Sequence, residues 1–143
     1  MPRMGAQMLV RLLQPDPILL DDPVRPKISP QRKLGWGRYV YMWIEGKEIG
    51  AIVCTAHRYN IPKTERELFQ THKHEDTGLK VILYSIWSYK PKCGSKLVNS
   101  IIAKNGQYRI ITMSPKTEMA RQFHLKNGAK VLQTNKTTVN YEY

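Results

Sequence analysis

Apolar residues along this chain fall into runs that predict several β-strands. Two runs, 38–44 and 49–56, flank the polar tetrapeptide Glu45-Gly46-Lys47-Glu48, a pattern typical of a β-hairpin. The run 80–89 is apolar and β-branched or aromatic almost throughout, which predicts a central strand buried on both faces. Three shorter runs predict a further strand and a closing hairpin: 108–113, 131–134 and 137–143.

Helix signals lie between these runs. Thr64 and Glu67 have the spacing of a capping box, which predicts a short helix over 64–72. A second helix is predicted to follow the basic loop 90–96 and to end at Asn105-Gly106. Its apolar residues recur on one helical face: Leu97, Val98, Ile101 and Ile102. The chain therefore has the order strand, basic loop and helix in this region.

A third helix is predicted over 115–127. Ser114 is a suitable N-cap, Pro115 suits the first helical position, and Gly128 suits the position just past the end. Because Ser114 also follows the carboxyl end of the strand 108–113, where α/β sheets usually bind ligands, this segment is a candidate site. Ser114 is thus interpreted either as a helix cap or as a hydrogen-bond donor to a substrate carbonyl or carboxylate.

The first part of the chain has a different character. Residues 14–37 contain five prolines and two glycines, which forbids a long helix and predicts an extended, turn-rich arm that wraps the fold. With 143 residues in all, we expect one domain, made of a proline-rich arm over 1–37 that packs on a domain over 38–143. The apolar run Met8-Leu9-Val10 is too short for a signal peptide or a membrane span, so no export or membrane insertion is expected.

Charge and cysteine content limit the partners. The net charge of +12, from 23 Lys and Arg against 11 Asp and Glu, favours phosphate-bearing partners such as nucleic acid, nucleotides or coenzyme A, although the excess forms no block or tail. Cys54 and Cys93 make no metal or redox pair, which favours a cytoplasmic protein. His72 and His74, with the acidic residues after them, do not have the spacing of a standard finger, so no metal is expected.

The order of elements from about residue 38 resembles the GNAT superfamily of acyl-CoA-dependent acyltransferases. The resemblance implies a single α/β domain with a mixed, mostly antiparallel twisted sheet flanked by helices, whose V-shaped splay between two central strands holds acyl-CoA. Coenzyme A would pair with the strand backbone at Ile86, Trp87 and Ser88. Its pyrophosphate would lie on the loop that follows, at Lys90, Lys92, Cys93, Gly94, Ser95 and Lys96.

This loop departs from the family pattern. If Gly94 takes the last glycine position of the family motif, Lys92 stands at the first glycine position and Tyr89 at the Arg or Gln position. Backbone N–H groups at a helix N-terminus bind phosphate whatever the side chains, and the three lysines add positive charge. The alternative interpretation of the loop is a plain basic turn.

The C-terminal segment carries a second resemblance. Ser-Pro, then Phe-His-Leu-x-Asn-Gly-Ala, then Val-Asn-Tyr-x-Tyr, over about residues 112–143, resembles the catalytic part of malonyl-CoA decarboxylase, itself a GNAT-fold enzyme. This resemblance implies that Ser114 and His124 carry the reaction, with Tyr141 and Tyr143 in the closing strand. The alternative for His124 is a surface or half-buried histidine beside the core residue Phe123.

Three functions remain open at this point. The first is an acyl-CoA-dependent acyltransferase, acting on acetyl-CoA or another acyl-CoA, in which His124 protonates the departing thiolate; the acceptor is a small amine, a protein or nucleic acid. The second is a decarboxylating lyase, and the third is a basic binding module without catalysis. Strand 80–89 has no acidic residue, so a base for an amine acceptor would come from Glu45, Glu142 or a water held by Tyr84.

Overall fold

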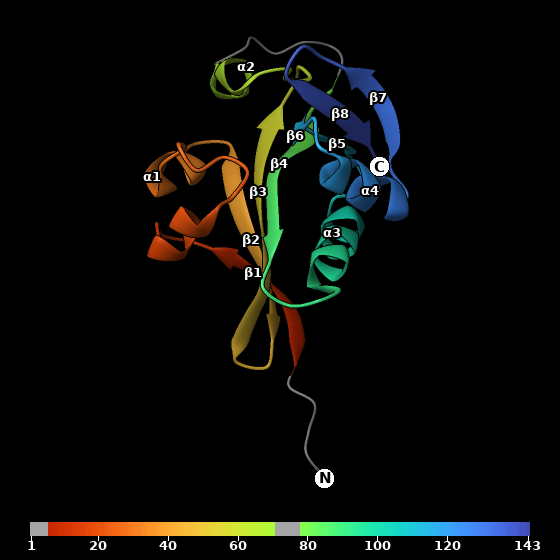
Figure 1. The fold of residues 1–143 in the computed structure, drawn as a ribbon. Helices are drawn as coiled ribbons and strands as arrows, with labels where there is room; N and C mark the ends of the chain where they lie inside the picture. The colour runs from red at the N-terminus through yellow and green to blue at the C-terminus, as the bar shows by residue number, and fades with distance from the viewer. Residues whose placement is uncertain (1–5, 71–77) are drawn as a thin grey trace.

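The protein forms one eight-stranded sheet with helices on both faces (Figure 1). The computed structural model describes residues 6–70 and 78–143. The strands are β1 (Gln7–Leu12), β2 (Arg38–Glu45), β3 (Glu48–Arg58), β4 (Lys80–Ser88), β5 (Arg109–Thr112), β6 (Ser114–Pro115), β7 (Lys130–Thr134) and β8 (Thr138–Glu142). The helices are the 3-10 helix η1 (Pro17–Asp21), α1 (Pro30–Lys33), α2 (Glu65–Phe69), α3 (Cys93–Lys104) and α4 (Glu118–Lys126).

The sheet has the mixed, mostly antiparallel organisation that the sequence predicts. The strand order is β1-β2-β3-β4-β5-β8-β6, with β7 paired to β8. Every pairing is antiparallel except that of β4 with β5, which α3 joins by a crossover. The hairpin β2–β3 and the closing hairpin β7–β8 are confirmed, and β4 is a central strand buried almost throughout, as its apolar sequence predicts. The fold class is therefore α/β with a twisted sheet flanked by helices.

One strand was not expected from the sequence. β1 pairs with β2 over its whole length and forms an edge of the sheet. Its residues are exposed or only half-buried, because an edge strand of this kind packs little against other elements. The six residues of β1 include an arginine and show no strong alternation of apolar and polar side chains. Pairing with β2 therefore decides that they form a strand.

The core lies on both faces of the sheet. One hydrophobic cluster packs between the sheet and the arm, and includes Leu19, Ile28, Ile82 and Tyr84. The other packs between the sheet and α3, and includes Leu83, Leu97 and Ile101. Figure 1 shows η1 and α1 beside one face of the sheet, and α3 and α4 beside the other. A ligand on the side of α3 and α4 is thus separated from the arm by the sheet.

The arm is less extended than the sequence predicts. It contains the two short helices η1 and α1, and no long helix, as its prolines require. Lys33 and Asp22 form an ion pair of 2.9 Å in which both side chains are fully buried. The arm therefore contributes both apolar and charged groups to the core, and the division of the chain at residue 37 stays a prediction.

The helix α2 begins as predicted and ends earlier. Thr64 accepts a hydrogen bond from the backbone N–H of Glu67 at 3.2 Å, which is the first half of the predicted capping box. The carboxylate of Glu67 reaches the backbone N–H of Lys63 rather than that of Thr64. Gln70 has extended backbone angles, so the helix ends at Phe69 and the prediction of a helix as far as residue 72 is wrong.

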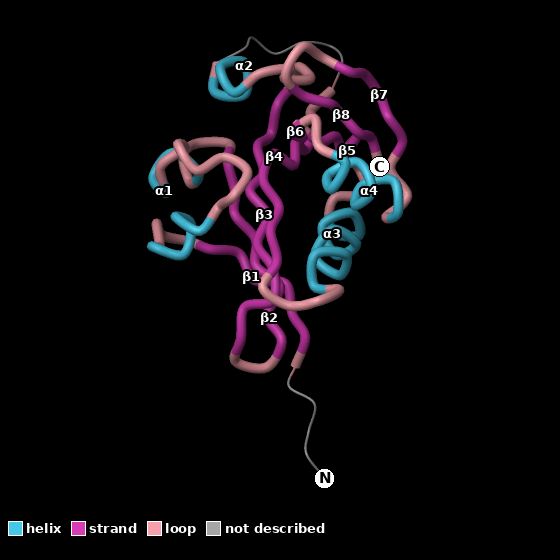
Figure 2. Tube along the Cα trace, viewed as in Figure 1, coloured by secondary structure: helices cyan, strands magenta, loops and turns pink. Residues whose placement is uncertain are grey.

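The start of α4 also differs from the prediction. The N-cap is Thr117, whose hydroxyl accepts from the backbone N–H of Ala120 at 3.2 Å, and the helix starts at Glu118. Ser114 and Pro115 form the short strand β6, which pairs with β8 just before the helix (Figure 2). The prediction of Ser114 as the helix cap is therefore wrong. The predicted end is confirmed, since Gly128 follows the helix with a φ of 96°.

Candidate functional site

The strands β4 and β5 part at the centre of the sheet. They pair only from Lys80–Arg109 to Leu83–Thr112, and one further hydrogen bond, from Met113 N to Leu83 O, closes the ladder. On the other side of β4 the register to β3 shifts at this point, so that Tyr84 is an extra residue in a β-bulge. Beyond it, β4 continues along β3 alone. Its backbone on the β5 side is therefore free to pair with an extended ligand.

The helix α3 begins near the end of this free edge. Its N-cap, Lys92, has a left-handed φ of 68° and makes no side-chain cap. Lys96 N donates to Lys92 O, and Cys93 N donates back to Lys90 O. The N–H groups of Gly94 and Ser95 in the first turn therefore have no acceptor within the helix, which is the arrangement that binds phosphate.

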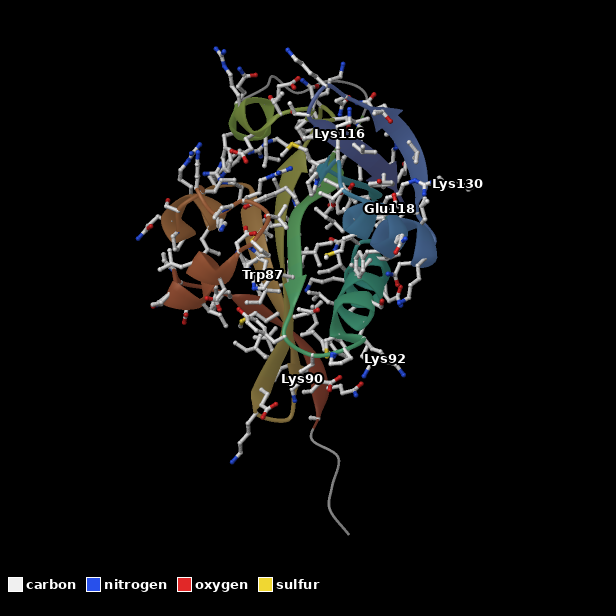
Figure 3. All side chains as sticks on the ribbon, in the orientation of Figure 1. Trp87, Lys90, Lys92, Lys116, Glu118 and Lys130 are labelled. Carbon is white, nitrogen blue, oxygen red and sulfur yellow. The ribbon has the colours of Figure 1, made fainter. Side chains whose placement is uncertain are left out.

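The lysines around the start of α3 differ in whether they form ion pairs. Lys90 forms an ion pair with Glu48, and Lys96 forms one of 2.8 Å with Glu45. Lys92 is exposed and has no ion pair with any described residue. Lys90 and Lys92 lie close to the end of β4 in Figure 3. Lys92 is thus the lysine of this loop that carries an uncompensated charge.

The other residues predicted to bind coenzyme A would offer the ligand their backbone rather than their side chains. Cys93 is buried in the cluster under α3, and burial raises the pKa of its thiol, so the thiol is unreactive. Trp87 packs on the arm side of the sheet (Figure 3), with its Nε1 donating to Tyr89 OH at 3.0 Å. Ile86 is half-buried on the α3 side and Ser88 is exposed. The ring of Phe123 lies so close to Gly94 that a Cβ atom added at Gly94 would be 3.2 Å from the ring.

A chain of side-chain hydrogen bonds lies under α4. Ser114 Oγ donates to Thr112 Oγ1 at 2.7 Å, and His124 Nε2 lies 3.1 Å from Ser114 Oγ. The other ring nitrogen, Nδ1, lies 2.6 Å from the hydroxyl of Tyr143. Because Ser114 donates to Thr112, it accepts from His124 Nε2–H, and Nδ1 then accepts from the Tyr143 hydroxyl. This order holds the neutral imidazole in one tautomer.

Three aromatic rings surround the imidazole of His124. Tyr141 stacks on it with ring centroids 5.0 Å apart, and Phe123 and Tyr143 meet it edge to face at 5.2 and 5.7 Å. His124 is 5% exposed, and this burial lowers its pKa to about 4. Burial likewise raises the pKa of Tyr143. The ring is therefore neutral at pH 7 in the free protein.

The structure brings together the three predicted catalytic residues, Ser114, His124 and Tyr141. It adds Thr112, and it places Tyr143, expected as a residue of the closing strand, on the other ring nitrogen. Ser114 and His124 are in contact, although they come from β6 and α4. Tyr141 stacks on the ring, and it is Tyr143, two residues along, that hydrogen-bonds to it. Thr112 was not expected from the sequence. Its position two residues before Ser114 is the available signal, because alternate residues of an extended chain share a face.

Within residues 6–70 and 78–143, no carboxylate lies against this chain of hydrogen bonds. The lowered pKa of His124 has burial as its cause, with no contribution from a neighbouring charge. Of the two acids considered as bases, Glu45 is paired with Lys96, and Glu142 forms a bidentate pair with Arg109 at 2.7 Å for both contacts. These pairings lower the pKa of both carboxyl groups, which makes them weak bases. The hydroxyl of Tyr84 is buried without a hydrogen-bond partner in the described part of the chain.

Within residues 6–70 and 78–143, no group of three His, Cys, Asp or Glu side chains is placed to hold a metal ion. His72, His74, Glu75 and Asp76 lie outside the described residues. No helix in those two ranges is long and apolar enough to cross a membrane.

Comparison with solved structures identifies the fold. A protein assigned to the GNAT family of acetyltransferases from Desulfovibrio desulfuricans superposes with a TM-score of 0.63 at 13% identity, covering 96% of this chain and 98% of that one. Malonyl-CoA decarboxylase from Cupriavidus metallidurans gives 0.61 at 14% identity. The chain has the GNAT fold.

Other comparisons set the limits of this result. Arabidopsis thaliana NAA60, solved in complex with acetyl-CoA, gives a TM-score of 0.50 at 10% identity and covers 94% of this chain and 97% of that one. The match to the decarboxylase covers 96% of this chain and 60% of the decarboxylase chain. No protein-family model matches the sequence, and no curated protein matches it at a significant level. Likeness at such low identity shows the fold and leaves the reaction to be argued from the site.

Proposed function

We propose that this GNAT-fold protein is an acyl-CoA-dependent acyltransferase whose thioester substrate lies between β4 and β5. The observation that carries this proposal is the parting of the two strands after Leu83 and Thr112, with the start of α3 near the end of the free edge. An extended pantetheine would pair with the free backbone of β4 at residues 86–88. The pyrophosphate would accept from the N–H groups of Gly94 and Ser95, with the charge of Lys92 beside it.

The chemistry is direct transfer of the acyl group. A nucleophile of the acceptor attacks the thioester carbonyl carbon, the C–S bond breaks, and the thiolate of coenzyme A takes up a proton. His124 would supply that proton through its Nε2 side, where Ser114 lies. A neutral, buried imidazole is a poor acid, but a negative charge that develops beside it raises its pKa, so protonation would accompany the arrival of the anion. The acceptor's own proton would leave to water, because the described residues place no free carboxylate at the site.

A decarboxylating lyase is the second candidate, and a specific observation favours it. Ser114 is not used as a helix cap, its hydroxyl lies in contact with His124, and no carboxylate of the described residues contributes to the pKa of that ring. Loss of carbon dioxide from malonyl-CoA needs no base: the C–C bond breaks, its electrons form the thioester enolate, and the enolate carbon takes up a proton. The malonyl carboxylate would also be the anion that raises the pKa of His124.

The first experiment is a thermal-shift titration with coenzyme A, acetyl-CoA and malonyl-CoA. A ligand that binds the native state raises the midpoint, by an amount equivalent to about 4 kcal/mol at about 1,000 times its dissociation constant. We expect all three to stabilise the protein. Preference for acetyl-CoA over malonyl-CoA supports transfer, and release of carbon dioxide from malonyl-CoA supports the lyase. The absence of a shift with any of the three would refute both enzymes and leave the basic binding module.

The second experiment tests the role of His124. The change His124→Gln keeps a polar side chain of similar size but removes the titratable ring, so turnover is expected to fall at least about tenfold while the affinity for coenzyme A stays unchanged. Gln122→Ala, on the exposed side of the same helix, is the matched control, because it removes only a contact with Glu118. Full activity in the histidine variant would show that the mechanism is wrong.

A further inference from the structure

The end of the sheet near α2 lies away from α3 and α4 (Figure 1). A hollow lies at this end of the sheet. It has a volume of about 450 Å³ and is formed where β2 begins, β3 ends and β4 begins. This volume falls within the range of small-molecule sites and is larger than a single inorganic anion needs. The residues on which the argument depends are Trp36, Arg38, Tyr39, His57, Arg58 and Phe69.

Two arginines in this hollow carry charges that no described carboxylate balances. Arg58 is 9% exposed, and it donates from Nε to Leu68 O at 2.7 Å and from Nη1 to His57 O at 2.8 Å. Arg38 donates from Nε to Arg32 O. Neither guanidinium forms an ion pair within residues 6–70 and 78–143, and none of the described residues that line the hollow is an Asp or a Glu.

The electrostatics of the two arginines favour the binding of an anion. Burial lowers the pKa of Arg58, and the positive charge of Arg38 lowers it further. Burial also lowers the pKa of Arg38, with a smaller contribution in the same direction from Arg32. Like charges held together at a partly buried position are unfavourable, and a bound anion removes that cost. Arginine is also the side chain best suited to bidentate phosphate contacts.

Aromatic rings lie among these cations. Phe69 has the guanidinium of Arg32 at 4.1 Å and that of Arg38 at 4.9 Å from its ring centre. Tyr39 has Arg11 at 4.4 Å and lies 4.7 Å from His57, centre to centre. Trp36 is 91% exposed at the rim, which leaves the faces of a large indole available for stacking. Exposed aromatic faces beside arginines are the surface on which nucleobases stack.

We propose that this hollow binds a nucleoside monophosphate unit, with Arg38 and Arg58 on its phosphate and the aromatic residues, Trp36 first, on its base. The ligand is a free nucleotide or one nucleotide of a single strand, and the chemistry of recognition is the same for both. The site is separate from the proposed acyl-CoA site, so the proposal of nucleotide binding does not depend on the proposed enzyme activity.

The test is calorimetric titration of the full chain at low ionic strength with AMP, with adenosine and with inorganic phosphate. We expect AMP to bind at least about tenfold more tightly than adenosine or inorganic phosphate, because only AMP contacts both the arginines and the aromatic rings. An adenylate pentanucleotide distinguishes the two sources of the ligand: equal affinity indicates a free nucleotide, and a tighter complex indicates a strand. Equal binding of AMP and phosphate would refute the aromatic part of the site.

Variants decide whether the binding occurs in this hollow. Trp36→Ala changes an exposed side chain without touching the core, and Arg38→Gln removes one guanidinium; each is expected to weaken AMP at least about fivefold. Arg121→Gln, on the outer surface of α4, makes the same charge change elsewhere and serves as the control. AMP affinity that is unchanged in the first two variants, or lowered equally by the control, would overturn the proposal. Coenzyme A affinity is measured in Trp36→Ala and is expected to stay unchanged.

Discussion

At the scale of single residues, the surroundings of His124 decide its chemistry. Both ring nitrogens have hydroxyl partners, and stacked or edge-on rings exclude water from the imidazole. The ring is therefore neutral and fixed in one tautomer, which makes it a hydrogen-bond donor toward Ser114 until an anion arrives. The role of His124 as an acid is thus coupled to substrate charge.

The same burial predicts how stability depends on pH. The pKa of His124 is about 4 in the folded protein and near 6.5 when unfolded, so between these values the unfolded state binds more protons. The stabilisation is complete above about pH 6.5 and is lost as the pH falls to about 4. We expect the difference in unfolding free energy between the wild type and His124→Gln to shrink by about 3 kcal/mol over this range. Parallel curves from urea denaturation of the two proteins would contradict the burial of the ring.

At the scale of elements, the most informative position is the start of a helix. The sequence predicts Ser114 as the cap of α4, and Thr117 lies three residues after it. Pairing of Ser114 and Pro115 with β8 removes the serine from the helix, and Thr117 then caps it. The displaced serine is the one that contacts His124. A tertiary pairing therefore converts a local cap signal into a site residue.

This assignment gives a stability prediction. Thr117→Ala removes the N-cap hydrogen bond and is expected to lower the free energy of unfolding by about 1 kcal/mol. Thr137→Ala, at an exposed position in the turn between β7 and β8, is the matched control and is expected to change little. The comparison is made by thermal and urea unfolding. A loss in the control as large as that in Thr117→Ala would argue against the cap.

The start of α3 gives a second prediction at this scale. Lys92 is the non-glycine residue with a left-handed φ in the described chain, at the position where the resemblance to GNAT enzymes places a glycine. Lys92→Gly is expected to raise the unfolding free energy by about 0.5–1 kcal/mol, because relief of the left-handed strain exceeds the added chain entropy. Lys47→Gly, an exposed lysine with a negative φ, is expected to be neutral or destabilising. A loss of stability in Lys92→Gly would show that the loop conformation differs.

At the scale of the whole molecule, buried charges hold the arm in its fold, and apolar side chains pack the arm on the sheet. Lys33 pairs with Asp22 and also donates to Leu19 O at 3.2 Å, and Asp22 accepts from two backbone N–H groups of the arm. Every one of these partners lies within the arm, while Leu19 and Ile28 pack in the cluster on the sheet. We propose that arm and domain unfold as one unit.

The ion pair provides the test. Lys33→Met leaves the carboxylate of Asp22 buried without its cation, and the unfolding free energy is expected to fall by about 3–5 kcal/mol in a single transition. Lys27→Met, an exposed lysine of the same arm, is the control and is expected to be nearly neutral. Urea unfolding followed by tryptophan fluorescence and by circular dichroism measures both variants. Separate transitions by the two probes would show that the arm is an independent unit.

The sequence by itself determined the strands of the two hairpins, the central strand β4, the order of elements and the end of α4. These features depend on apolar periodicity and on turn residues such as Gly128, which act locally. The order of elements suggested the fold class through its resemblance to the GNAT superfamily, and the resemblance of the C-terminal segment to malonyl-CoA decarboxylase suggested Ser114 and His124 as a pair. The sequence could not give the distance between the side chains of Ser114 and His124.

The tertiary structure alone decided the rest. β1 is a strand because β2 offers an open edge, and Ser114 leaves its helix because β8 offers a partner. Thr112, the last residue of β5, contacts Ser114, and Tyr143, which directly follows β8, contacts His124. The hydrogen bonds of His124 to Ser114 and Tyr143 join residues of different elements, so they depend on packing that no local pattern encodes.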